Sequence, residues 1–74
     1  MRLAQAKERQ TLKVIAIKGG YNALNKLRVL GIVEGSLVTV ENNSNHGPIT
    51  LLNQDGMKIA LGRRLAERVE VSNV

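Results

Sequence analysis

The segment Ala23–Gly35, with the sequence ALNKLRVLGIVEG, contains a short helical pattern that stops at a glycine. Its apolar residues recur at helical spacing and predict a helix over about residues 22–30: Leu24, Leu27 and Leu30. Asn22 is expected to cap this helix through its side-chain oxygen. Gly31 is expected to end it, because glycine readily adopts the left-handed conformation of a helix stop. A helix this short, set among strands, indicates a small β-barrel with an inserted helix.

Strands are predicted on both sides of this helix. The apolar run over residues 12–17 predicts a first strand, and its apolar residues fall on both faces, which a bulge near Ile15 and Ala16 explains. Asp55-Gly56 is a strong hairpin-turn signal. Further strands are predicted over residues 36–42, 48–52, 57–61 and 68–72, and short helical turns near residues 3–6 and 63–67. The fold class expected is mainly β, a small SH3-like barrel of about five strands.

Length and composition indicate a single domain without a membrane span, a signal peptide or disulfides. It has 74 residues, 43% of them hydrophobic, and no linker or repeat divides it, so a single domain over residues 1–74 is expected. No apolar run approaches the length of a membrane span, and residues 1–10 are mostly polar, unlike a signal peptide. The absence of cysteine excludes disulfides and agrees with a reducing compartment. A cytoplasmic location is therefore expected.

The charge is basic, with a formal net value of +5 at pH 7. Basic residues are spread along the chain and cluster only at Arg63, Arg64 and Arg68. Tyr21 is the sole aromatic residue, so the stacking surfaces of single-strand and RNA-recognition domains are missing. The charge therefore favours solubility or attraction to an acidic partner over nucleic-acid binding.

The order and spacing of the apolar and glycine residues resemble the FeoA family over essentially the whole chain, from Leu3 to Val71. The most specific part is the helix that ends in Leu-Gly-Ile and is followed by Gly35. The residues that carry the resemblance are Val14, Ile17, Gly19-Gly20, Leu24, Leu27, Leu30-Gly31-Ile32, Gly35, Val38, Val40, Gly47-Pro48-Ile49, Gly56, Ile59-Ala60-Leu61, Ala66, Val69 and Val71. These residue types fill cores and permit turns, so they are interpreted as fold residues rather than contact residues.

The resemblance implies a cytoplasmic, non-catalytic accessory of bacterial ferrous-iron transport that interacts with the GTP-binding iron permease. Similar domains form the C-terminal part of some metal-dependent repressors. A stand-alone accessory is expected instead, since residues 1–74 hold the barrel without a DNA-binding segment before it. An RNA-binding KOW-type barrel is another alternative, because Gly35 to Val40 and Gly47 loosely match its turn pattern. Three positions depart from the family pattern: Glu8-Arg9 in place of Pro-Gly, Glu34 in place of Pro, and Gly62 in place of a basic residue.

Two groups of residues are candidates for the partner surface. Leu37 and Leu52 fall out of phase with the core residues of their strands, so they are predicted to form an outward apolar patch for a partner or for self-association. The other group is Arg63, Arg64 and Arg68, which could dock on acidic groups of a partner.

No catalytic, cofactor-binding or metal-binding residue is expected. His46 is the only histidine, and its neighbours Asn43, Ser44 and Asn45 offer no carboxylate to a ferrous ion. Gly19-Gly20 lacks the further glycine and the Lys-Ser/Thr pair of a phosphate loop. Any GTP chemistry is expected to belong to the partner.

Overall fold

The computed structural model describes residues 1–44 and 46–74, so Asn45 of the loop predicted after the second strand lies outside the described residues. Five strands form one antiparallel sheet in the order β4-β3-β2-β1-β5. The elements follow the chain as η1 (Leu3–Gln5), β1 (Thr11–Ile17), α1 (Gly20–Val29), β2 (Leu37–Asn43), β3 (Ile49–Leu52), β4 (Lys58–Leu61), α2 (Arg63–Ala66) and β5 (Val69–Asn73). The predicted fold class, including both short helical turns, is confirmed.

The inserted helix begins earlier than predicted and ends as predicted. α1 starts at Gly20 after Gly19, whose φ is +102°, and no side chain caps it, so the expectation that Asn22 is the cap was wrong. The two glycines let the chain turn directly from β1 into the helix. At the other end Gly31 has a φ of +77°, and the Ile32 amide donates to the Leu27 carbonyl at 2.9 Å. This is the glycine-based helix stop that the sequence indicates.

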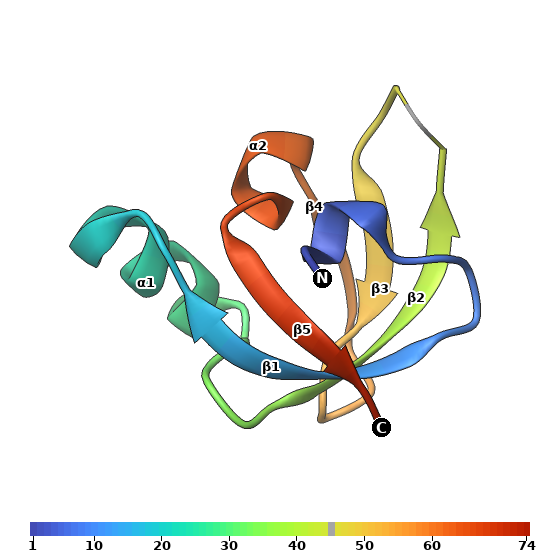
Figure 1. The fold of residues 1–74 in the computed structure, drawn as a ribbon, viewed down its shortest axis with the longest axis horizontal. Coiled ribbons are helices and arrows are strands. Elements are labelled where there is room, and N and C mark those ends of the chain that lie inside the picture. Colours follow the sequence, from blue (N-terminus) through green and yellow to red (C-terminus); the bar gives the residue numbers. More distant parts are fainter. Residues whose placement is uncertain (45) are drawn as a thin grey trace.

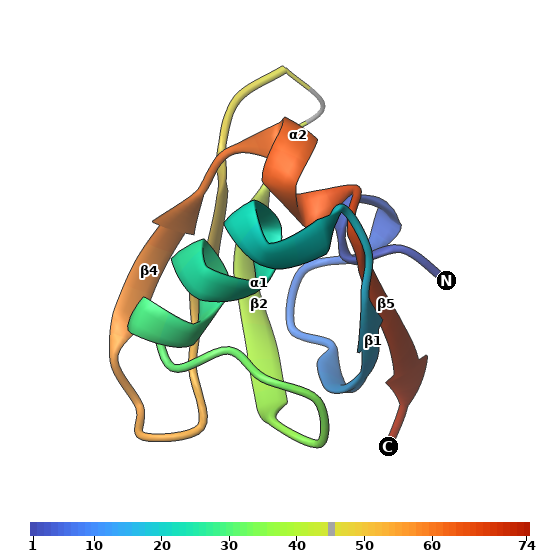
Figure 2. The same ribbon diagram turned by 90° about the vertical axis from the view of Figure 1, so that its left-hand side faces the viewer.

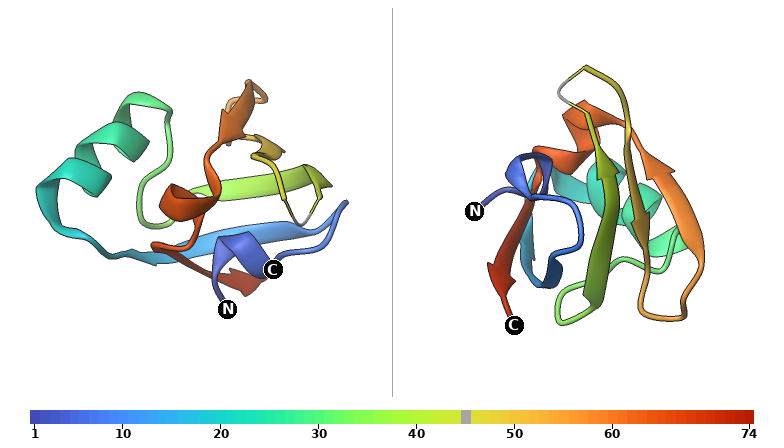
Figure 3. Two further views of the ribbon diagram at one scale, coloured as in Figure 1. Left: turned by 90° about the horizontal axis from the view of Figure 1, so that it is seen from above. Right: turned by 90° about the vertical axis from the view of Figure 1, so that its right-hand side faces the viewer.

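The sheet curls, and α1 covers its open side. Figure 1 shows β1 and β5 side by side, with α2 next to η1 at one end. In Figure 2, α1 lies in front of the curled sheet, between β4 and the β1–β5 pair. Figure 3 shows β2 and β3 as the wall opposite the helix. The strands alternate buried and outward residues, which puts one apolar face toward the helix.

One core fills the space between sheet and helix. The bulge expected in β1 is present between Val14 and Ala16, and it leaves Ile15 51% exposed while Ile17 packs against the core. From α1, Leu27 is fully buried, whereas Leu24 and Leu30 are half-buried. The buried cluster comprises Leu3, Ala6, Leu12, Val14, Leu27, Ile32, Val38, Val40, Ile49, Leu51, Ile59, Leu61, Ala66, Val69 and Val71.

The buried side chain of Asn53 joins the end of α1 to the hairpin between β3 and β4. Its Nδ2 donates to the Leu30 carbonyl at 3.1 Å. Its Oδ1 accepts from the amides of Asp55 and Met57, each at 2.9 Å. The side-chain amide of Asn53, the first residue of the turn, thus holds the predicted hairpin at Asp55-Gly56. The same amide also fixes the end of α1.

We predict that Asn53→Ala lowers the free energy of unfolding by about 2–4 kcal/mol, because three partly buried backbone groups lose their partner. Urea denaturation measures this change. The control is Asn25→Ala on the exposed face of α1, which should change stability by less than about 0.5 kcal/mol. Equal stability of the Asn53 and Asn25 variants would contradict the account.

Candidate functional site

The three arginines singled out in the sequence separate into two groups. Arg63, at the start of α2, turns inward and bonds to main chain. Its Nη1 donates to the Ala4 carbonyl at 3.2 Å, and its Nη2 donates to Asn43 Oδ1 at 2.7 Å. The same Nη2 contacts the carbonyl oxygens of Ser44 and of Gly47, the latter at 3.1 Å. Because these bonds hold the guanidinium group inside the fold, Arg63 does not join Arg64 and Arg68 at the surface.

Asn43 completes this network. Its Nδ2 donates to the carbonyl oxygens of Ala4 and Ala6, at 3.1 and 2.6 Å. Arg63 and Asn43 together tie η1 to the end of β2 and to the start of α2. The Nε of Arg63 is buried and has no hydrogen-bond partner among the described residues. The pattern is that of a structural arginine, whose planar fork serves several acceptors at once.

Arg64 and Arg68 are exposed and line two adjoining hollows beside α2. The first hollow, of about 330 Å³, also has Lys26 and the small or apolar residues Gly19, Ala23 and Leu65 in its lining. The second, of about 530 Å³, is lined in addition by Arg2, Lys18 and Glu67. We call the two hollows together the cationic groove, defined by its five basic side chains: Arg2, Lys18, Lys26, Arg64 and Arg68.

Three of these five cations were missed by sequence reasoning because they lie far from the arginine cluster in the chain. β1 and β5 pair in antiparallel register, and the Lys18 amide donates to the Arg68 carbonyl at 2.8 Å. Lys26 comes from α1, and Arg2 precedes η1. Pairing of the first and last strands is the one signal that would have placed Lys18 beside Arg68.

Gly19 lets Arg68 lie across the start of α1. A Cβ added at Gly19 would stand 2.6 Å from Cδ and 2.8 Å from Nη1 of Arg68. These separations are too short for real contacts, and the φ of +102° disfavours other residues as well. The glycine thereby leaves room for the Arg68 side chain at the edge of the groove.

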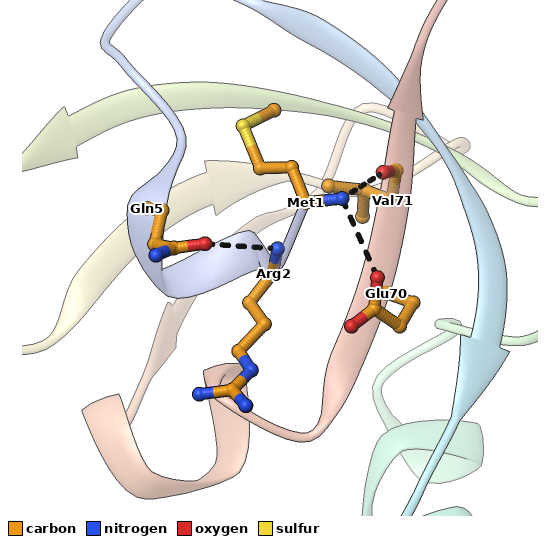
Figure 4. A network of polar contacts seen from close by, with 5 residues as sticks. All are labelled: Met1, Arg2, Gln5, Glu70 and Val71. Carbon is orange, nitrogen blue, oxygen red and sulfur yellow. Dashed lines mark hydrogen bonds and ion pairs between the residues drawn. The ribbon is translucent and has the colours of Figure 1, made fainter.

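The acidic residues next to the groove form no ion pair with its cations within the described residues. Glu70 pairs with the Met1 ammonium group at 3.4 Å, and that group also donates to the Val71 carbonyl at 3.2 Å (Figure 4). In Figure 4 the Arg2 side chain extends away from this pair. Within residues 1–44 and 46–74, the ion pairs are this one and Lys58–Glu41, so none involves a groove cation. Glu67 lines the groove without closing an ion pair there.

Leu37 and Leu52 both lie on the outer face of the sheet. Leu37 is 39% exposed and stands opposite Lys13 of β1. Leu52 is half-buried and stands opposite Thr39, two residues along β2 from Leu37. The two leucines are therefore diagonal neighbours among polar side chains. Their contact with a partner remains a prediction.

Metal-ligating side chains do not gather in the described part of the chain. There, no three side chains of the histidine, cysteine, aspartate and glutamate types converge as a metal site would require. His46 is exposed in the turn after β2. No described helix has the length and hydropathy needed to cross a bilayer.

Comparisons with known proteins agree on one family. Residues 1–73 match the FeoA domain. An Fe(2+) transport protein A from Methanocaldococcus jannaschii is 38% identical over 71 residues, which cover 96% of this chain and 84% of that protein. The crystal structure of an iron uptake regulatory protein (FeoA) has a TM-score of 0.95 at 31% identity and is covered over 97% of its length by the whole of this chain.

The same fold occurs in a larger protein. A manganese-dependent transcriptional repressor in complex with manganese aligns with all of this chain at a TM-score of 0.91 and 21% identity. This chain spans 36% of that repressor, and the likeness shows a shared fold.

We predict that Arg63→Lys lowers the free energy of unfolding by about 1–3 kcal/mol, because an ammonium group keeps the charge but loses the fork that serves four acceptors. The matched control is Arg64→Lys at the neighbouring exposed position, where the change should stay within about 0.5 kcal/mol. Thermal and urea unfolding of both variants measure the difference. An Arg63 variant as stable as the Arg64 variant would contradict the structural role.

Proposed function

This chain belongs to the FeoA domain family, and we propose that it is a non-catalytic accessory of ferrous-iron transport that binds the cytoplasmic GTP-binding part of an iron permease. The observation that carries this proposal is the match to the family over residues 1–73, together with the Fe(2+) transport relative. A cytoplasmic location is part of the proposal, because the GTP-binding part of the permease is cytoplasmic.

The surface of the domain supports a binding role. The core is filled by apolar side chains, and the polar groups of Asn53 and Arg63 are used to hold turns and segments together. The cationic groove and the outer leucines are available to a partner, as are other exposed apolar side chains such as Tyr21 and Val29 of α1. A small barrel that presents charged and apolar side chains in this way offers contacts to another protein.

We predict that the purified chain binds the isolated GTP-binding domain of the permease, and that the heat of binding is measurable by titration calorimetry. Titrations with GDP and with a non-hydrolysable GTP analogue show whether binding depends on the nucleotide state. A panel of single-stranded and double-stranded RNA and DNA at physiological salt is the comparison. Binding of the nucleic acids with a steep salt dependence, and none of the GTP-binding domain, would favour the KOW-type alternative instead.

The outer leucines are proposed to support self-association of the domain. Because the apolar patch formed by Leu37 and Leu52 is small, we expect a weak dimer, visible only at high protein concentration. Sedimentation equilibrium should then show less dimer for the double variant Leu37→Ser, Leu52→Ser than for the native chain. A native chain that stays monomeric throughout would remove this role for the patch.

A further inference from the structure

We propose that the cationic groove is the docking site for an acidic, extended polypeptide segment of the partner. The inference rests on the proposed function for the identity of that partner. The geometry of the five cations and of the hollows between them carries the argument.

The cations are arranged along the groove rather than around one point. Arg64 and Arg68 line both hollows, Lys26 lines only the first, and Arg2 and Lys18 line only the second. A single phosphate or metal-bound anion would need the donors to converge. Cations distributed over two adjoining hollows instead match several carboxylates spaced along one chain.

These side chains are available to a ligand. Within the part of the chain that the structure describes, none of the five has an ion-pair partner, and Glu70 is occupied by the Met1 ammonium group. Arginine donates to a carboxylate in bidentate fashion, so Arg64 and Arg68 give the groove directional donors as well as charge. The hollows, of about 330 and 530 Å³, are open to solvent and have room for side chains of a bound segment.

The lining favours a polypeptide over nucleic acid. The first hollow has an apolar wall of Ala23 and Leu65, which suits the aliphatic parts of a peptide. No aromatic residue lines either hollow as described, so bases would find no stacking surface. Glu67 stands among the cations of the second hollow, and a polypeptide can place an uncharged residue beside it, whereas a phosphate backbone carries a charge at every unit.

The test compares two charge reversals that change the net charge equally. The groove variant is Arg64→Glu with Arg68→Glu, and the control is Lys7→Glu with Arg28→Glu, at exposed positions outside the groove. Circular dichroism and thermal unfolding establish that both variants fold. The probes are the GTP-binding domain of the permease and a labelled synthetic peptide in which glutamate alternates with glycine. Vesicles containing phosphatidylserine and a single-stranded RNA serve as the competing anions.

We expect the groove variant to lose at least about tenfold in affinity for both the domain and the peptide near 0.1 M salt, and the control to change by less than about threefold. The native affinity should fall as salt rises, and the groove variant should show a weaker salt dependence. Arg64→Lys with Arg68→Lys should restore part of the affinity, because charge returns without the bidentate geometry.

Other outcomes separate the two proposals. If the GTP-binding domain binds the groove variant and the control equally, the groove assignment is wrong and the proposed function stands. If the peptide binds in the groove while the domain does not bind the native chain, the groove assignment stands and the proposed partner is wrong. Binding of vesicles or RNA without binding of the peptide would overturn the polypeptide assignment.

Discussion

The guanidinium group of Arg63 holds together the end of the barrel that strand pairing leaves open. The edge strands β4 and β5 do not pair with each other, and the chain passes between them through α2. At this end Arg63 joins main-chain oxygens of η1 and of the loop before β3. Asn43 adds one bond to Ala4 of η1 and one to Ala6, which follows it. A small domain has few other ways to fix such an end, because it has a single core.

This arrangement also shapes the surface. Arg63 and Arg64 are neighbours in the chain, yet the first is used inside the fold and the second faces the groove. By fixing η1 against α2, the Arg63 network sets where Arg2 and Arg64 stand relative to each other. The proposed docking groove therefore depends on a residue that lines neither of its hollows. An arginine cluster in a sequence is thus a poor guide to which arginines meet a partner.

Features with a local cause were predictable from the sequence. The stop of α1 at Gly31, the bulge after Val14 and the hairpin at Asp55-Gly56 each follow from residues next to one another in the chain. The start of α1 was misplaced because two glycines turn the chain more sharply than a capping side chain would. Similarly, Arg9 takes a φ of +72° where the family pattern has glycine, a conformation that non-glycine residues rarely adopt.

Features that depend on distant residues were not predictable. The bonds of Asn53 to the end of α1, and of Arg63 to η1, join segments that only the folded chain brings together. The groove likewise collects cations from the N-terminal segment, β1, α1 and the α2–β5 region. The residues that carry the family resemblance lie mostly in the core and the turns. They therefore identified the fold but not the surface that binds a partner.

The most direct test of the account is to map the bound surface by NMR on the ¹⁵N-labelled chain during titration with the GTP-binding domain. We expect amide signals to shift around the groove, at Arg2, Lys18, Lys26, Arg64 and Arg68. Shifts concentrated on the outer sheet face around Leu37 and Leu52, with the groove signals unchanged, would contradict it.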